Sequence, residues 1–99
     1  MTTATQDPGL FLMISLASGP KHGHAMMRDV ESFAGVHLGP GTLYGALTRL
    51  DEGGLVEPLA AQGRRQPYRL TPAGLSALRA RLAELGQAVS IGLSRVTGR

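Results

Sequence analysis

The chain has 99 residues, a net charge of +3 and no cysteine. This length fits one domain with a modest core, and the lack of cysteine excludes a disulfide framework and a thiolate metal site. No stretch has the length of a membrane span, and the N-terminus lacks the basic start of a secretory signal, so we expect a cytoplasmic protein. The basic balance favours an anionic partner.

The first part of the chain predicts a tail and an apolar helix. Residues 1–6 are small and polar and predict a disordered tail. Asp7 and Pro8 form a helix-start signal, and Ser18-Gly19-Pro20 ends the apolar run that follows. The pattern predicts a helix over residues 7–18. Because it is apolar nearly all round, we expect burial on more than one side, partly by a second subunit.

A second helix is predicted from about His22 to Phe33, ended by Gly35. The charges of Lys21 and Arg28 near its start could touch a phosphate backbone or form a solvated face. Both interpretations stay open from the residues alone.

The three histidines do not predict a metal site. His22 and His24 are two residues apart, so they do not share a helix face, and His37 is remote in sequence. A metal-sensing protein is therefore disfavoured. The segment 36–38 begins with a β-branched residue and is compatible with a brief strand.

Residues 40–52 predict a third helix. Pro40 suits its first position, and Gly39 is a weaker N-cap than Ser or Asp. One face is apolar, with Leu43, Ala46, Leu47 and Leu50 at helical spacing. The opposite face carries Thr42, Tyr44, Thr48 and Arg49, with no acid before Asp51. Such a face suits a DNA major groove, and an ordinary amphipathic surface helix is the alternative.

A β-hairpin follows directly. Residues 55–60 and 68–70 predict two strands, and Pro58 places the first at an edge or a bulge. The connecting loop carries Arg64 and Arg65 at its tip. Three helices and a two-stranded wing are the order of a winged helix-turn-helix, so the basic loop stands where a wing reaches the adjacent groove.

A long last helix is predicted from Pro72 to about Val96. Its apolar residues follow a heptad seam, with Leu75, Leu78, Leu82, Leu85 and Val89 spaced 3, 4, 3 and 4 apart. The seam could pack on its own domain. We favour a partly intermolecular role, because a small core cannot cover both this seam and the apolar first helix, whose Leu10 and Ile14 would help to cover it.

Catalytic patterns are missing from the sequence. It has no paired carboxylates on one face, no Gly-x-Ser-x-Gly elbow and no phosphate loop with a lysine. We therefore expect neither an enzyme nor a cofactor.

Several stretches resemble the PadR-like transcriptional regulators. They lie within residues 10–80 and include Gly19-Pro20-Lys21-His22-Gly23-His24, Pro40-Gly41-Thr42-Leu43-Tyr44, Gly53-Gly54-Leu55-Val56 and Tyr68-Arg69-Leu70-Thr71. The second stretch together with the last is the specific part. The resemblance implies a mainly α fold with a small β-hairpin: a winged helix-turn-helix plus a long C-terminal dimerisation helix. It implies a DNA-binding domain over 7–71, a dimerisation helix over 72–97, and a homodimer that represses transcription from a two-fold, palindromic operator.

The resemblance also implies site residues. Thr42, Tyr44 and Thr48 would contact DNA, Arg49 would clamp a phosphate, Arg64 and Arg65 would belong to the wing, and Lys21 and His22 would touch phosphate beside the second helix. The family commonly has an aromatic residue where this chain has His24, and it often has Ser where this chain has Gly39. The chain has no Trp, so binding of planar drugs between Trp residues is not carried over, and a small-molecule effector stays open.

The competing hypothesis is a winged-helix module that binds protein and no nucleic acid. Such a module need not concentrate arginine at the wing tip or keep acids off the front of the third helix. The sequence does both, which favours DNA.

Overall fold

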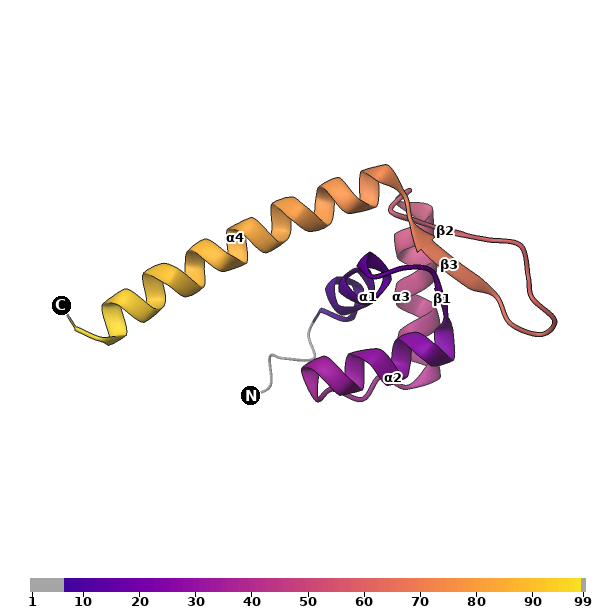
Figure 1. The fold of residues 1–99 in the computed structure, drawn as a ribbon, viewed down its shortest axis with the longest axis horizontal. Coiled ribbons are helices and arrows are strands. Elements are labelled where there is room, and N and C mark those ends of the chain that lie inside the picture. The colour runs from indigo at the N-terminus through magenta and orange to yellow at the C-terminus, as the bar shows by residue number, and fades with distance from the viewer. Residues whose placement is uncertain (1–6, 99) are drawn as a thin grey trace.

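A computed structural model describes residues 7–98; the predicted tail over 1–6 lies outside the described residues. The elements follow in the order α1 (Pro8–Ala17), β1 (Lys21–His22), α2 (Gly23–Ala34), α3 (Pro40–Glu52), β2 (Val56–Pro58), β3 (Pro67–Leu70) and α4 (Pro72–Val96). The first three helices pack together beside a small sheet, while α4 leaves the sheet, passes α1 and extends beyond it (Figure 1). The wing loop and the end of α4 lie at opposite ends of the molecule.

The helices begin at residues that cap them. The Asp7 carboxylate accepts a hydrogen bond from the Leu10 amide at 3.1 Å. At the start of α3, Gly39 makes no side-chain cap, as its missing side chain requires. The cap of α2 is His22, whose Nδ1 accepts from the Ala25 amide at 3.3 Å. His22 therefore precedes the helix that was predicted to begin with it.

The sheet has the strand order β1-β3-β2, and all its pairs are antiparallel. The predicted hairpin is β2 and β3, and its tip closes between Gln62 and Arg65, which exchange backbone hydrogen bonds of 2.8 and 3.0 Å. Gly63 has φ +63° at the first turn position, where a tight hairpin turn favours glycine. The strand β1 was not predicted. The segment 36–38 forms no strand, so that expectation was wrong.

The core lies between the first three helices and the sheet. It contains Leu12, Leu16, Met26, Val30, Leu43, Leu47, Val56 and Leu78 among others. Val36 and Leu38 also point into it from the irregular segment between α2 and α3, so core burial explains their apolar character. The buried Ser15 hydroxyl donates to the Asp29 carboxylate at 2.7 Å and ties α1 to α2.

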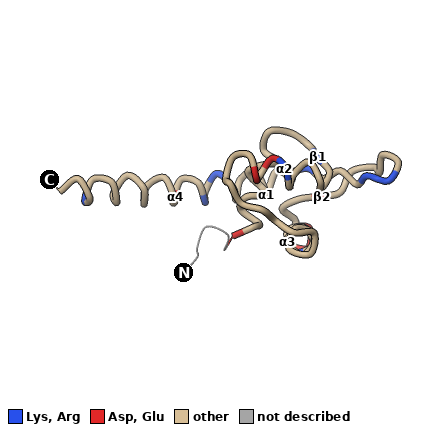
Figure 2. Tube along the Cα trace, turned by 90° about the horizontal axis from the view of Figure 1, so that it is seen from below, with Lys and Arg blue, Asp and Glu red and all other residues tan. Residues whose placement is uncertain are grey.

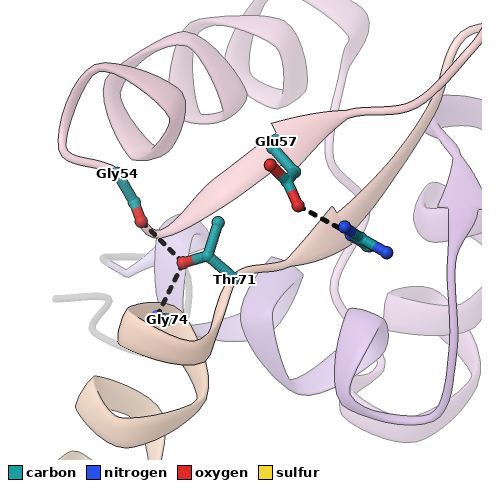
Figure 3. Close-up of polar contacts among 5 residues, drawn as sticks. Gly54, Glu57, Thr71 and Gly74 are labelled. Carbon is teal, nitrogen blue, oxygen red and sulfur yellow. Dashed lines mark hydrogen bonds and ion pairs between the residues drawn. The ribbon is translucent and has the colours of Figure 1, made fainter.

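The first turn of α4 is fixed to the base of the wing. The Thr71 hydroxyl donates to the Gly54 carbonyl at 2.6 Å and accepts from the Gly74 amide at 3.0 Å (Figure 3). A Cβ built on Gly74 would lie 1.9 Å from the Leu55 carbonyl oxygen, so only glycine fits there. Nearby, Arg69 and Glu57 form an ion pair of 2.7 Å across β2 and β3.

Candidate nucleic-acid interface

The outward face of α3 is exposed, and glycines leave part of its backbone uncovered by side chains. Leu43, Ala46, Leu47 and Leu50 are buried, whereas Thr42, Tyr44, Thr48 and Arg49 are exposed, as the periodicity predicted. At about 100° per residue, Gly41 and Gly45 lie between Thr48 and Arg49 on the helix surface. A Cβ on Gly41 would meet no atom within 4 Å. The backbone of α3 can therefore closely approach a groove between these side chains.

Arg49 and Thr48 occupy this face differently. The Thr48 hydroxyl donates to the Tyr44 carbonyl at 2.9 Å, which leaves its oxygen as an acceptor. Arg49 lies on the edge nearest α1, where it borders a hollow of about 250 Å³ with Asp7 and Pro8. Among residues 7–98 its guanidinium makes no hydrogen bond or ion pair, so its five donors are available to an anion.

Tyr44 lies on the other edge of α3, against the start of α2. Its ring is 47% exposed, and its hydroxyl reaches over Gly23, where a Cβ would come within 2.5 Å. It therefore combines a packing role with an exposed surface. Burial, followed by the Asp51 and Tyr44 charges, raises the pKa of the neighbouring Tyr68, so Tyr68 stays a neutral hydroxyl at physiological pH.

The wing carries two arginines in different settings. Figure 2 shows basic residues at the end of the wing loop, far from α4. Arg64 is exposed and makes no hydrogen bond or ion pair within the described part of the chain. Arg65 instead turns back, and its guanidinium lies 3.4 Å from Nε2 of His22. The loop is braced by Gln66, whose side-chain amide donates to the Leu59 carbonyl.

His22 sits in a positive environment at the junction of β1, α2 and the wing. Local desolvation lowers its pKa, and the charges of Arg65, His24 and Arg28 lower it further. The imidazole is therefore neutral at physiological pH, which its role as the acceptor at the N-cap of α2 requires.

Lys21 has a structural role that the sequence did not reveal. Its ammonium donates to the Ser15 carbonyl, to the Ser18 hydroxyl at 2.7 Å and to the Gly19 carbonyl at 3.4 Å. These groups lie at the C-terminal end of α1, where lysine favourably pairs with unsatisfied carbonyls. The capped end fixes the turn into β1, so Lys21 holds the start of the wing sheet and its charge is directed inward.

The residues expected at a dimer contact divide into two sets. Leu10 and Ile14 are partly buried against the core. Along α4, Leu82 is 42% and Val89 59% exposed, Leu75 is exposed and Leu85 partly so. Leu78 differs, since it is 2% exposed within its own protomer. It belongs to the core and not to the open seam.

The sequence did not reveal that Phe33 is exposed. This ring is 46% exposed at the end of α2 and meets Phe11 edge to face, with centroids 6.2 Å apart. The signal was present as an apolar residue in the last turn of α2. It could not be recognised as surface before the position of Phe11 was known.

Two features are absent from the described residues. No helix in residues 7–98 combines the length and apolar character needed to cross a bilayer. No group of three or more His, Cys, Asp or Glu side chains in that range could hold a metal ion.

Known proteins resemble this chain in sequence and in fold. Residues 12–80 match the transcriptional regulator PadR-like family. The transcriptional regulator Rv3488 of Mycobacterium tuberculosis is 38% identical over 95 residues, covering 90% of this chain and 88% of the relative. An uncharacterised 37.1 kDa protein in transposon TN4556 of Streptomyces fradiae is 41% identical over 95 residues, covering 96% of this chain but only 25% of that protein.

Solved structures agree on the fold. A PadR-like regulator from Bacillus cereus superposes with a TM-score of 0.83 at 15% identity, covering 95% of both chains. A PadR family regulator from Clostridium difficile gives 0.80 at 20% identity, covering 93% of this chain and 99% of the other. The predicted winged helix-turn-helix fold is confirmed. The chain belongs to the PadR-like family of transcriptional regulators, and it is a DNA-binding regulator, not an enzyme.

Proposed function

We propose that this regulator is a repressor that binds a two-fold operator as a homodimer. Residues 7–71 form the DNA-binding unit, which sets α3 into a major groove and lays the wing along the adjacent backbone. Residues 72–97 form the dimerisation helix. A dimer seated over a promoter would exclude the polymerase sterically and so repress transcription, which is the role that the family resemblance implies.

The observation that carries the DNA assignment is the distribution of unpaired cations around α3. Arg49 stands on one edge of the helix, and Arg64 stands beyond the other edge at the wing tip. Neither is neutralised by a carboxylate of the described residues. Cations on both sides of an exposed helix match the two phosphate backbones that border a major groove. Thr48 lies between them and Thr42 lies beside Arg49 in the first turn of the helix, where both hydroxyls are placed to reach base edges.

The dimer is supported by the surface of α4. Beyond Leu78 this helix leaves the core, yet Leu82, Val89 and Leu93 remain exposed and apolar. Exposed apolar residues that repeat along one helix face mark an interaction surface. Two such faces related by a two-fold axis would cover each other, with Leu10 and Ile14 at the margin.

Genomic fragments that the purified protein selects should contain an inverted repeat, and binding to them should weaken steeply with salt. Sedimentation should show a dimer both free and on DNA. Binding of DNA with little salt dependence, or a protein that stays monomeric at tens of micromolar, would contradict the proposal. Failure to bind any duplex would favour the protein-interaction module.

A further inference from the structure

Three parts of the DNA-binding unit meet at His22. It ends β1, pairing with Pro67 of β3, and it caps α2. Its ring also faces Arg65 of the wing at 3.4 Å. Both side chains are reachable from solvent, since Arg65 is exposed and His22 is partly exposed.

The two contacts of the His22 ring fix where its proton lies. Nδ1 accepts from the Ala25 amide, so it carries no hydrogen, and a neutral imidazole must then carry its proton on Nε2. The lowered pKa of His22 agrees with this neutral form. Nε2 is therefore a donor.

With this tautomer, the facing groups of His22 and Arg65 lack a hydrogen-bond acceptor between them. A guanidinium has donors only, so Nε2–H of His22 and the N–H groups of Arg65 cannot hydrogen-bond to each other, although they lie side by side. Two neighbouring donors with one full positive charge can be joined by an anionic group that has at least two acceptor oxygens. A phosphate diester meets this requirement.

We propose that Nε2–H of His22 and the guanidinium of Arg65 together hold one phosphate of the DNA backbone. This assignment rests on the proposed function and deepens it, since it places one phosphate at the junction of α2 and the wing. Arg64, at the wing tip, contacts a different phosphate. The two wing arginines therefore act separately, and only Arg65 acts jointly with a residue outside the wing.

His22→Asn separates the cap from the phosphate contact. Asparagine is a good N-cap, but it places no donor where Nε2 stood. The melting temperature should stay close to that of the wild type, while operator affinity should fall roughly tenfold per half-site, as loss of a hydrogen bond to a charged group predicts. His22→Ser, with the same capping ability, provides a second variant if the first folds poorly.

A double-mutant cycle tests the joint contact. Arg65→Ala should weaken binding much less in the His22→Asn background than in the wild type, because the shared phosphate is already partly released. The matched control is Arg64→Ala, whose cost should be equal in both backgrounds. Equal costs for Arg65→Ala in both backgrounds would overturn the shared site.

A measurement on the wild-type protein complements the variants. Replacing single operator phosphates by uncharged methylphosphonates should identify one position at which affinity falls and His22→Asn causes no further loss. Absence of such a position would overturn the shared phosphate site. The proposed function would still stand if operator binding remained salt-dependent. Saturable binding of inorganic phosphate at this pair, followed by imidazole nitrogen NMR at submillimolar concentration without DNA, would assign the site to a soluble anion instead.

Discussion

The hydroxyl of Tyr44 occupies the space that a side chain on Gly23 would need, with 2.5 Å between its oxygen and an ideal Cβ at Gly23. This contact joins the start of α2 to the outward edge of α3. Tyr44 is half exposed, so its ring can swing away at modest cost. Gly23→Ala should therefore lower stability by about 1–2 kcal/mol and weaken operator binding by displacing Tyr44. Urea unfolding and DNA titration measure the two effects.

Two variants control this prediction. Gly9→Ala adds a methyl group at an ordinary distance of 3.7 Å from Leu50 and should change neither quantity strongly. Tyr44→Ala should itself weaken binding and remove the nearest obstacle at Gly23, which leaves Cδ2 of Leu43 at 3.0 Å. Adding Gly23→Ala to Tyr44→Ala should then cause a smaller further loss of stability than Gly23→Ala causes in the wild type, and an equal loss in both backgrounds would show that Leu43 and not Tyr44 opposes the methyl group.

The wing arginines should govern salt dependence more than sequence preference. Replacing Arg64 and Arg65 by alanine removes two phosphate contacts per half-site, so the slope of log affinity against log salt should decrease by up to about two units per half-site. Affinity for all duplexes should fall by a similar factor. A double variant that lost sequence preference but kept its slope would indicate that the wing reads bases.

Stability should depend on pH through His22. Its pKa is lower in the fold than in the unfolded chain, so the unfolded state binds more protons in acid. The stabilisation is present above about pH 6.5 and is lost as the pH falls through the folded pKa. Between pH 7 and 5 the melting temperature should change less with pH for His22→Asn than for the wild type. His24→Asn should reduce the dependence less than His22→Asn does, because the charge of His24 only adds to the lowering of the His22 pKa.

Much of this fold follows from local signals. The Asp7-Pro8 and Thr71-Pro72 starts, the glycine stop after α2 and the apolar spacing of α3 depend on residues close in sequence. Their helices were predicted to within a residue or two. The position of the exposed face of α3 followed from the same periodicity.

The errors concern contacts between distant residues. The strand β1 exists because it pairs with β3 more than forty residues away, and no local pattern marks two residues as a strand. The inward direction of the Lys21 ammonium depends on where the chain turns after α1. The heptad seam of α4 could not separate Leu78 from Leu82, because the helix leaves the core between them.

The joint between α4 and the wing should tolerate no side chain. Gly74→Ala places a Cβ against the Leu55 backbone, which cannot rotate away as a side chain can. We expect a loss of about 3 kcal/mol or more, at the upper end for overpacking, by urea unfolding. Gly86→Ala is the matched control in the same helix, since its Cβ meets nothing within 4 Å, and it should stabilise by up to about 1 kcal/mol. Equal stabilities for the two variants would contradict the tight joint.

Dimerisation should fail when a charge enters the exposed seam. Leu82→Asp would place a carboxylate and its symmetry copy in an apolar contact, so the dimer should dissociate. Operator affinity should then collapse, since each half-site is bound singly. Gln87→Asp, on the opposite side of α4, should stay dimeric. Sedimentation measures the oligomeric state of both variants, and a dimeric Leu82→Asp protein would exclude this helix as the main dimer contact.

The close contact of Gly74 with the Leu55 backbone makes this position the point about which the long helix α4 would tilt. The helix has 25 residues, so at the usual rise it is about 37 Å long, and a tilt of about 5° at Gly74 would move its far end by about 3 Å. In the proposed dimer, a shift of a few ångströms between the paired helices therefore rotates each DNA-binding unit by only a few degrees. The tolerance of the regulator for different operator spacings would then depend on the stiffness of this joint and not on the residues that touch bases.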